Sequence, residues 1–234
     1  MVVLYGTGLG PPQLAVATSG NDGLYATQLA GTTLSFNGAP APMIYTSATQ
    51  VGAIVPYGIT RSTATSGPNT GQVTITVTYQ GQSSATIEEF IALITPSIPG
   101  LFTSDSTGQG QAAAINSDGI TVNTAATPAK VSDVVSLYAT GEGQTTPAGV
   151  DGKLATPSYP KPNLLSLTVT IGGKQAQVFY AGGAPGEVAG LMQLNVQIPN
   201  GIQTGNSVPV VLQVSYTLDF GGGLVGTGTV SSQA

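Results

Sequence analysis

The sequence lacks three residue types that many active sites need. Its 234 residues include no cysteine, no histidine and no tryptophan. Disulfides are therefore excluded, as are zinc sites built on cysteine or histidine ligands and a Ser-His-Asp triad. Charged residues are also scarce, at 6% of the sequence, against about 25% in an ordinary globular domain. Composition alone thus argues against the common hydrolytic and metal-dependent chemistries, and we expect no cofactor.

Positive charge is the scarcest kind. The net charge is −5, and the cationic side chains are Arg61, Lys130, Lys153, Lys161 and Lys174. So few cations cannot neutralise the phosphates of a nucleic acid, which is excluded as a partner. No apolar run reaches the length of a membrane span. No signal-peptide pattern is visible, so a secreted precursor would carry one ahead of Met1. Solubility must rest on uncharged polar residues, which favours an extracellular or cell-surface protein.

The sequence does contain an internal repeat. Three segments recur in the same order: 3–10 as 136–143, 33–45 as 168–180, and 50–59 as 193–202. Two copies of one folding unit explain this order better than chance, and the length suits two domains. We therefore expect one domain over 1–95. A second domain, over 96–234, would include a linker hairpin and a C-terminal hairpin extension.

Both halves carry strand patterns. Residues 72–79 and 166–171 alternate at period two and are rich in β-branched side chains, which is typical of half-buried strands. Asn37-Gly38 and Gly172-Gly173 are turn pairs that tolerate positive φ. No long helical periodicity is present. The sequence predicts an all-β protein made of two tandem Ig-like β-sandwich domains.

The repeated motifs also resemble a known family. Leu-Tyr-(Gly/Ala)-Thr-Gly-x-Gly, Asn-Gly-x-Pro-Ala-Pro-x-x-Tyr and Pro-Gly-Leu-Phe-Thr are similar to motifs of the acidobacterial-type (Solibacter-type) C-terminal repeat family of large secreted bacterial proteins. The resemblance covers nearly the whole chain. It implies an Ig-like fold at the end of a long secreted protein and provides no catalytic residue. We therefore expect a non-catalytic structural or adhesive module whose partners are its own copies or neighbouring domains.

Several motifs invite a chemical interpretation that their context does not favour. The glycine motif at 5–10 lacks the Lys-Ser/Thr of a P-loop and the third glycine of a dinucleotide site, so we expect a strand-exit turn there. Glu142 and Asp151 flank one loop and are the only candidate carboxylate pair. The Asp-Gly pairs at 22–23, 118–119 and 151–152 offer oxygen ligands for calcium, but turn formation is the expected role of such pairs.

Carbohydrate binding is the alternative function. Tyr25, Tyr57 and Tyr159 lie in loop-like segments and offer rings on which a polysaccharide would stack. Four other tyrosines recur at matching repeat positions, and we expect them to pack in the cores: Tyr5, Tyr45, Tyr138 and Tyr180.

The C-terminal end carries the last prediction. Residues 86–94 form a closing strand in the first copy, whereas the second copy stops at 230–234 without a visible equivalent. An open groove in the second sandwich would then accept a strand from another chain and build a filament. The candidate residues for this strand-exchange tail are Leu224, Val225, Thr227, Thr229 and Val230.

Overall fold

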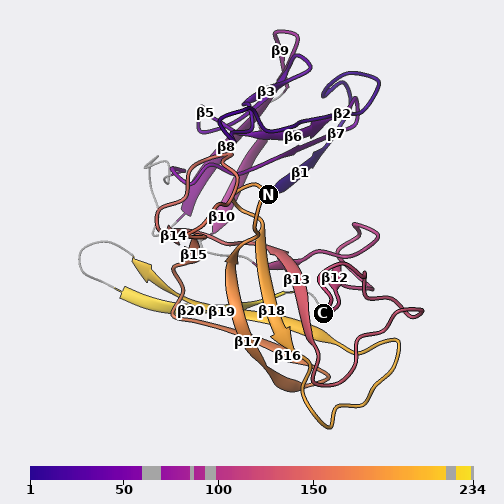
Figure 1. Cartoon of the computed structure of the whole chain (residues 1–234). Coiled ribbons are helices and arrows are strands. Elements are labelled where there is room, and N and C mark those ends of the chain that lie inside the picture. Colours follow the sequence, from indigo (N-terminus) through magenta and orange to yellow (C-terminus); the bar gives the residue numbers. More distant parts are fainter. Residues whose placement is uncertain (60–69, 85–86, 93–98, 220–224, 233–234) are drawn as a thin grey trace. The chain divides into compact units, whose positions relative to one another are not determined.

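The protein is built from antiparallel strands. The computed structural model describes residues 1–59, 70–84, 87–92, 99–219 and 225–232 (Figure 1), and these residues contain strands but no helix. The predicted all-β class is therefore confirmed, and the layered antiparallel sheets are β-sandwich-like.

The chain divides into two compact units. Unit 1 comprises Met1–Ile94 with Gly149–Thr156 and Gly186–Gly190, and unit 2 comprises the other residues. The predicted cut between 95 and 96 lies among residues 93–98, outside the described part of the chain. The sequence prediction differs at the two later segments, which it assigned to the second domain. No sequence pattern indicates that these two segments belong to unit 1.

Unit 1 contains two sheets. One has the strand order β1-β7-β6-β2, and the other has the order β10-β8-β4-β3, with β5 paired to β4 and β9 paired to β8. The strands are β1 (Val2–Tyr5), β2 (Ala15–Val16), β3 (Gln28–Leu29), β4 (Thr32–Phe36), β5 (Ala39–Pro40), β6 (Met43–Thr46), β7 (Gln50–Ala53), β8 (Thr70–Tyr79), β9 (Gln82–Ser83) and β10 (Ile87–Ala92).

The core of unit 1 lies where these two sheets face each other. Alternate residues of β4 and β8 point inward, and the same alternation places Val51 and Ala53 of β7 in the core. Fully buried side chains include Leu34, Met43 and Val51. Period-two burial of this kind is what packs one face of an antiparallel sheet and leaves the other to solvent.

Two loops from the later part of the chain complete unit 1. Leu154 N donates to Gly23 O, and Tyr25 N donates to Gly152 O, each at 2.9 Å. Asp151 Oδ1 accepts from Tyr57 N at 2.7 Å. The 149–156 loop therefore binds backbone groups of residues 23–57. The 186–190 loop pairs with it in turn, since Gly186 N donates to Ala155 O and Ala155 N donates to Glu187 O.

Unit 2 has one main sheet in the order β11-β13-β18-β17-β16-β19-β20, with β12 paired to β13 and a separate β14-β15 pair. Its strands are β11 (Gly100–Leu101), β12 (Ala114–Ile115), β13 (Val134–Thr140), β14 (Thr145–Thr146), β15 (Lys161–Pro162), β16 (Ser166–Ile171), β17 (Lys174–Gly183), β18 (Met192–Gln197), β19 (Val210–Asp219) and β20 (Val225–Ser231).

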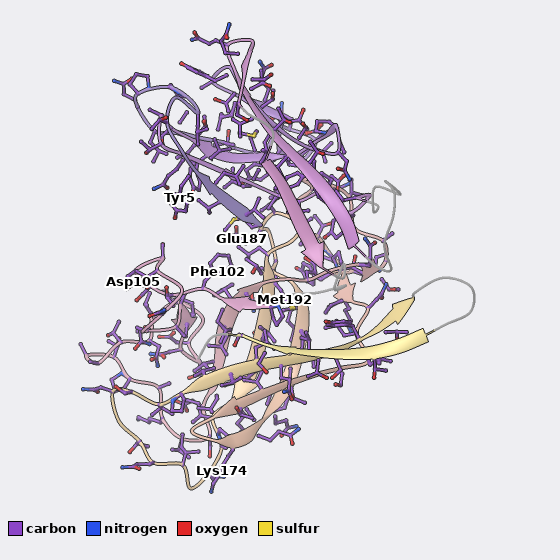
Figure 2. All side chains as sticks on the ribbon, turned by 180° about the vertical axis from the view of Figure 1, so that it is seen from behind. Tyr5, Phe102, Asp105, Lys174, Glu187 and Met192 are labelled. Atoms are coloured by element: carbon purple, nitrogen blue, oxygen red, sulfur yellow. The ribbon has the colours of Figure 1, made fainter. Side chains whose placement is uncertain are left out.

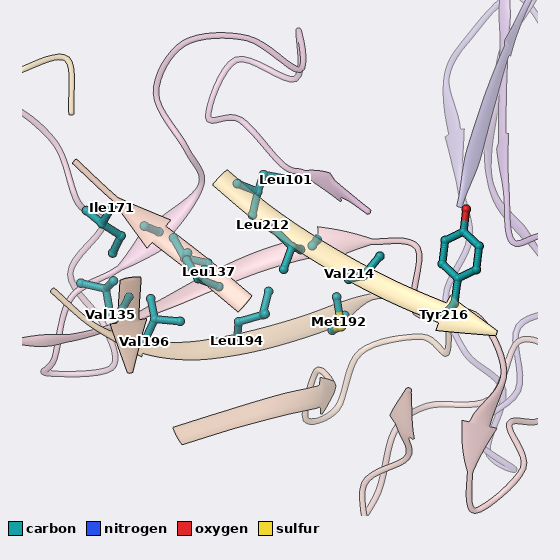
Figure 3. Packing of buried hydrophobic residues seen from close by; sticks show 14 residues of the cluster. Leu101, Val135, Leu137, Ile171, Met192, Leu194, Val196, Leu212, Val214 and Tyr216 are labelled. Carbon is teal, nitrogen blue, oxygen red and sulfur yellow. The ribbon is translucent and has the colours of Figure 1, made fainter. Parts of the chain in front are cut away.

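The sheet of unit 2 folds over on itself to enclose a core. The first residues of β17 pair with β16 and its later residues pair with β18, so this strand belongs to both layers. Leu212 and Val214 of β19 then lie over Leu137 of β13 and Leu194 of β18 (Figure 3). The four side chains are at most 2% exposed.

The two units share one order of strand pairing. In unit 1, β1 pairs with β7, β7 with β6, β4 with β8 and β8 with β10. In unit 2, β13 pairs with β18, β18 with β17, β16 with β19 and β19 with β20. The segments that recur in the sequence thus occupy corresponding strands.

The predicted gap in the second copy is filled by the chain itself. β20 pairs with β19 along seven residue pairs, from Gln213 opposite Ser231 to Asp219 opposite Val225. This is the place that β10 takes beside β8 in unit 1. The expectation that the second copy lacks its closing strand was therefore wrong. Glycine and threonine replace the apolar pattern of residues 87–92, which hid the equivalence.

Candidate functional site

The outer side of the first sheet in unit 1 carries an aromatic and aliphatic surface. Because Val51 and Ala53 point into the core, Gln50 and Gly52 of β7 face outward. Tyr5 lies opposite Gln50, and Tyr45 lies opposite Gly52. On the far side of β6, Val16 lies opposite Tyr45. We call the surface made of Tyr5, Val16, Tyr45 and Gln50 the outer face of unit 1. Leu14 is counted with it, because it lies two residues before Val16 and strand alternation turns both side chains to the same side.

Three apolar or aromatic side chains of this face are largely exposed to solvent, which is unusual for residues of this kind. Tyr5 is 73% exposed (Figure 2), Val16 64% and Leu14 63%. The expected core position of Tyr5 was therefore wrong. Strand alternation explains the error, because Leu4 points inward to the core and Tyr5 must then point outward.

A glycine makes room for the second tyrosine of this face. A Cβ atom at Gly52 would lie 2.3 Å from Cε1 of Tyr45, so the ring of Tyr45 rests directly on the backbone of β7. Burial raises the pKa of the Tyr45 hydroxyl, and the nearby Tyr5 raises it further. The two tyrosines are thus neighbours on one face, although their strands are separated by β7.

Unit 2 repeats this arrangement with more polar neighbours. Tyr138 of β13 lies opposite Gln193, and Tyr180 of β17 lies opposite Asn195. Leu137 takes the core position beside Tyr138, which is only half-buried. The core positions expected for Tyr45, Tyr138 and Tyr180 were therefore also wrong, for the same reason of alternation.

Tyr180 is more firmly held than Tyr5. Its hydroxyl donates to Gly183 O at 2.6 Å, and Tyr159 packs edge-on against its ring with centroids 6.4 Å apart. Burial raises the pKa of Tyr180, with smaller contributions from Tyr159 and Glu142. Tyr159, one of the three predicted ligand-binding tyrosines, therefore supports another aromatic ring and is itself half-buried.

The other two predicted ligand-binding tyrosines lie in unit 1, beside the 149–156 loop. The hydroxyl oxygen of Tyr57 is buried, and a Cβ at Gly149 would lie 2.3 Å from its ring. Tyr25 is half-buried and donates its backbone N–H to Gly152. Tyr57 thus packs its ring against a neighbouring loop, whereas Tyr159 belongs to unit 2.

The carboxylates of the Asp-Gly pairs accept hydrogen bonds from backbone N–H groups. Asp22 accepts from Leu24 at 3.0 Å, and Asp118 accepts from Ile120 and Thr121 at 3.0 and 2.8 Å. The hydroxyl of Thr121 also donates to Asp118, and these bonds lower the pKa of this carboxyl. Asp22 and Asp118 thus use their carboxylates to shape their own turns, as Asx chemistry favours, whereas Asp151 binds the distant Tyr57 N.

The predicted carboxylate pair is divided between the units. Asp151 belongs to unit 1, where it accepts from Tyr57 N. Glu142 belongs to unit 2, is 2% exposed and lies close enough to Tyr180 to raise the pKa of that hydroxyl. Within the described ranges, no group of three or more acidic side chains is close enough to hold a metal ion.

The predicted strand-exchange tail is part of β20. Thr227 lies opposite Thr217, and Thr229 lies opposite Ser215, with their side-chain oxygens 3.1 Å apart. Val225 and Val230 also lie within the ladder to β19, while Leu224 falls outside the described residues. The tail is thus already paired within its own chain.

Unit 2 also contains a cavity that the sequence did not reveal. Its volume is about 560 Å³. The cavity lies between the start of β13, the end of β16, the start of β19 and the loops at 103–112, 123–131 and 198–209. The sequence could not predict this cavity, because its pattern does not show which loops cover the end of the sandwich.

Comparisons with known proteins do not assign the chain to a family. No protein-family model, curated protein or solved structure matched it. Within the described residues, no helix is long and apolar enough to cross a membrane. Function must therefore be argued from the surfaces described above.

Proposed function

We propose that this chain is a non-catalytic structural or adhesive module of a secreted or cell-surface protein. The main support for this proposal is the exposure of the outer face of unit 1, where Tyr5, Leu14 and Val16 are each more than 60% exposed. Neighbouring domains of a larger chain, or other copies of the module, are the partners that we propose for this face. We further propose that both units are Ig-like copies of one repeat, which their shared strand pairing supports.

The chemistry of this face suits contact with another surface. Its side chains are uncharged, so a partner can cover them without removing ions from water. Fully burying an exposed aliphatic or aromatic side chain contributes about 1.5–3 kcal/mol. A contiguous group of exposed apolar residues is typical of interaction sites. The resemblance to a family of secreted C-terminal repeats supports the same location.

Adhesion measurements test this proposal. The purified chain would be passed over alkyl-, hydroxyl- and amine-terminated sensor surfaces, and its retention would be recorded for the native protein and for Tyr5→Ser/Val16→Ser. We expect the double variant to lose most of its retention on the alkyl surface. Ile120→Ser is the matched control, since Ile120 is 83% exposed but belongs to unit 2. Equal retention of all three proteins would refute the proposal.

Carbohydrate binding is a second candidate, and the neighbouring tyrosines of the outer face favour it. Tyr5 is exposed beside Tyr45, and the amide of Gln50 lies opposite Tyr5. Aromatic rings and amides are the groups that stack on sugars and bind their hydroxyls. A glycan array, probed with and without calcium, should show binding that Tyr5→Ala abolishes and Tyr57→Ala preserves. A silent array would remove this candidate.

A further inference from the structure

We propose that the cavity of unit 2 is a binding site for a small, uncharged and mainly aliphatic molecule. Its volume of about 560 Å³ falls within the range of small-ligand sites, roughly 300–1,000 Å³. This function is separate from the adhesive role of unit 1, and neither depends on the other.

The floor of the cavity is the hydrophobic core itself. Val135 and Leu137 of β13 line it, together with Leu101 of β11 and Ile171 of β16. These side chains are at most 7% exposed and belong to the buried cluster of unit 2. Figure 3 shows Val135 and Ile171 beside each other in this cluster. A ligand that enters would therefore contact aliphatic side chains that are already held in place by the sheets.

The walls carry neither charge nor aromatic rings. None of the described residues that line the cavity is Asp, Glu, Lys, Arg, Phe, Tyr or Trp. A charged ligand would lose its hydration without gaining a partner, which costs several kcal/mol. A sugar would find no ring on which to stack. The lining therefore selects an aliphatic chain and rejects ionised or saccharide ligands.

Polar groups gather at the mouth. The 198–209 loop contributes Thr204 and Asn206, both exposed, and the 103–112 loop contributes Gln109 and Gln111. The side-chain amide of Gln111 reaches Asn123 at 3.4 Å, which links two of the loops. Hydroxyl and amide groups at the rim of an apolar site usually fix the orientation of a ligand. The matching ligand has one uncharged polar end and an aliphatic body.

Titration of the full chain with three probes of equal length tests the ligand class. 1-Octanol is the neutral probe, and octanoate and octylammonium are its charged counterparts at pH 7. Calorimetry and the methyl resonances of Val135 and Ile171 report binding. We expect 1-octanol to bind and shift these resonances, and the charged probes to bind at least about tenfold more weakly. Octanoate binding as tightly as 1-octanol would overturn the proposal.

Filling the cavity tests the location. Ala112 and Ala129 line it, so Ala112→Leu and Ala129→Leu should each weaken 1-octanol binding by about tenfold or more. Ala113→Leu is the matched control, because Ala113 is the neighbour of Ala112 and does not line the cavity. Far-UV circular dichroism verifies folding. If both filled variants bind 1-octanol as the native chain does, or if Ala113→Leu weakens binding equally, the proposed site is wrong.

Discussion

At the scale of single residues, the outer face of unit 1 depends on small and large side chains fitting across strands. Gly52 has no side chain, and Tyr45 covers its backbone. The buried hydroxyl of Thr46 donates to Thr32 at 3.1 Å, and Thr32 donates to Leu9 O at 3.3 Å. The exposed face and the core are therefore connected through β6, where Tyr45 points outward and Thr46 inward.

Gly52→Ala should destabilise unit 1 by about 1–3 kcal/mol, because the new methyl group would overlap the Tyr45 ring at 2.3 Å. Urea unfolding measures this loss. Gly58→Ala is the control, since a Cβ there would have no atom within 4 Å. The double variant Gly52→Ala/Tyr45→Ala should recover part of the loss. If it is no more stable than expected from adding the single losses, Tyr45 is not the obstacle.

The raised pKa of Tyr180 predicts that unit 2 becomes less stable at alkaline pH. Burial raises its pKa in the folded chain above the ordinary value of 10.0, so the folded state holds this proton more tightly than the unfolded state does. The stabilisation is complete below about pH 10 and is lost as the pH rises through the folded-state pKa. Denaturant unfolding from pH 8 to 11 should show this decline, and Tyr180→Phe should make it shallower. An unchanged slope in the variant would contradict the assignment.

At the scale of strands, the sequence predicted the elements better than their boundaries. Alternation correctly indicated β8 and β16, because their β-branched residues have period two. The 224–230 tail was predicted to pair with another chain, because Gly226, Thr227, Gly228 and Thr229 give no apolar signal that would mark β20 as the closing strand of its own unit. The residue opposite Gly228 explains this composition: a Cβ at Gly228 would lie 2.6 Å from the Tyr216 ring.

The outward tyrosines show a second limit of prediction from sequence. The repeat led to core positions being predicted for Tyr5 and Tyr138, but repetition alone does not determine on which face of the strand they lie. Period two fixes only which residues share a face, and the face toward the core is decided by packing against a second sheet. The cavity and the shared loops also depend on contacts between segments distant in sequence, which no local pattern encodes.

β20 supplies a direct test at this scale. Leu212 N donates to Ser232 Oγ at 3.0 Å, and Ser232 N donates to Leu212 O at 2.8 Å. Ser232→Ala removes the first bond and leaves a buried N–H, so unit 2 should lose about 1–3 kcal/mol of unfolding free energy. Ser231→Ala, at an exposed neighbour, is the control. Deleting residues 221–234 should destabilise unit 2 more strongly; a deletion variant as stable as the native chain would show that β20 is dispensable.

At the scale of the whole molecule, the two units are not independent in sequence. Unit 1 incorporates Gly149–Thr156 and Gly186–Gly190, which lie between strands of unit 2 along the chain. Asp151 illustrates the consequence, because its carboxylate accepts the backbone N–H of Tyr57 at 2.7 Å. Removing the second half of the chain would therefore also remove structural parts of unit 1.

Asp151→Ala should therefore destabilise unit 1, although the residue lies in the second half of the sequence. Loss of a part-buried acceptor of this kind costs about 1–3 kcal/mol. Hydrogen exchange, read separately for amides of β6 and β7 and for amides of β18 and β19, locates the effect. Faster exchange in unit 1 alone is the expected result. Asp118→Ala, whose carboxylate shapes a turn of unit 2, should leave unit 1 unchanged; faster exchange in unit 2 for Asp151→Ala would contradict the division.

We propose that the module adheres through the outer face of unit 1. Covalent labelling of the native chain, compared between the free protein and the protein adhered to an alkyl surface, tests it most directly. Tyr5, Leu14 and Val16 are accessible in the free chain, so they should be modified there and protected after adhesion, while Ile120 and Phe179 remain modified to the same extent. Protection of Ile120 or Phe179 with unchanged labelling of Tyr5 would contradict adhesion through the outer face of unit 1.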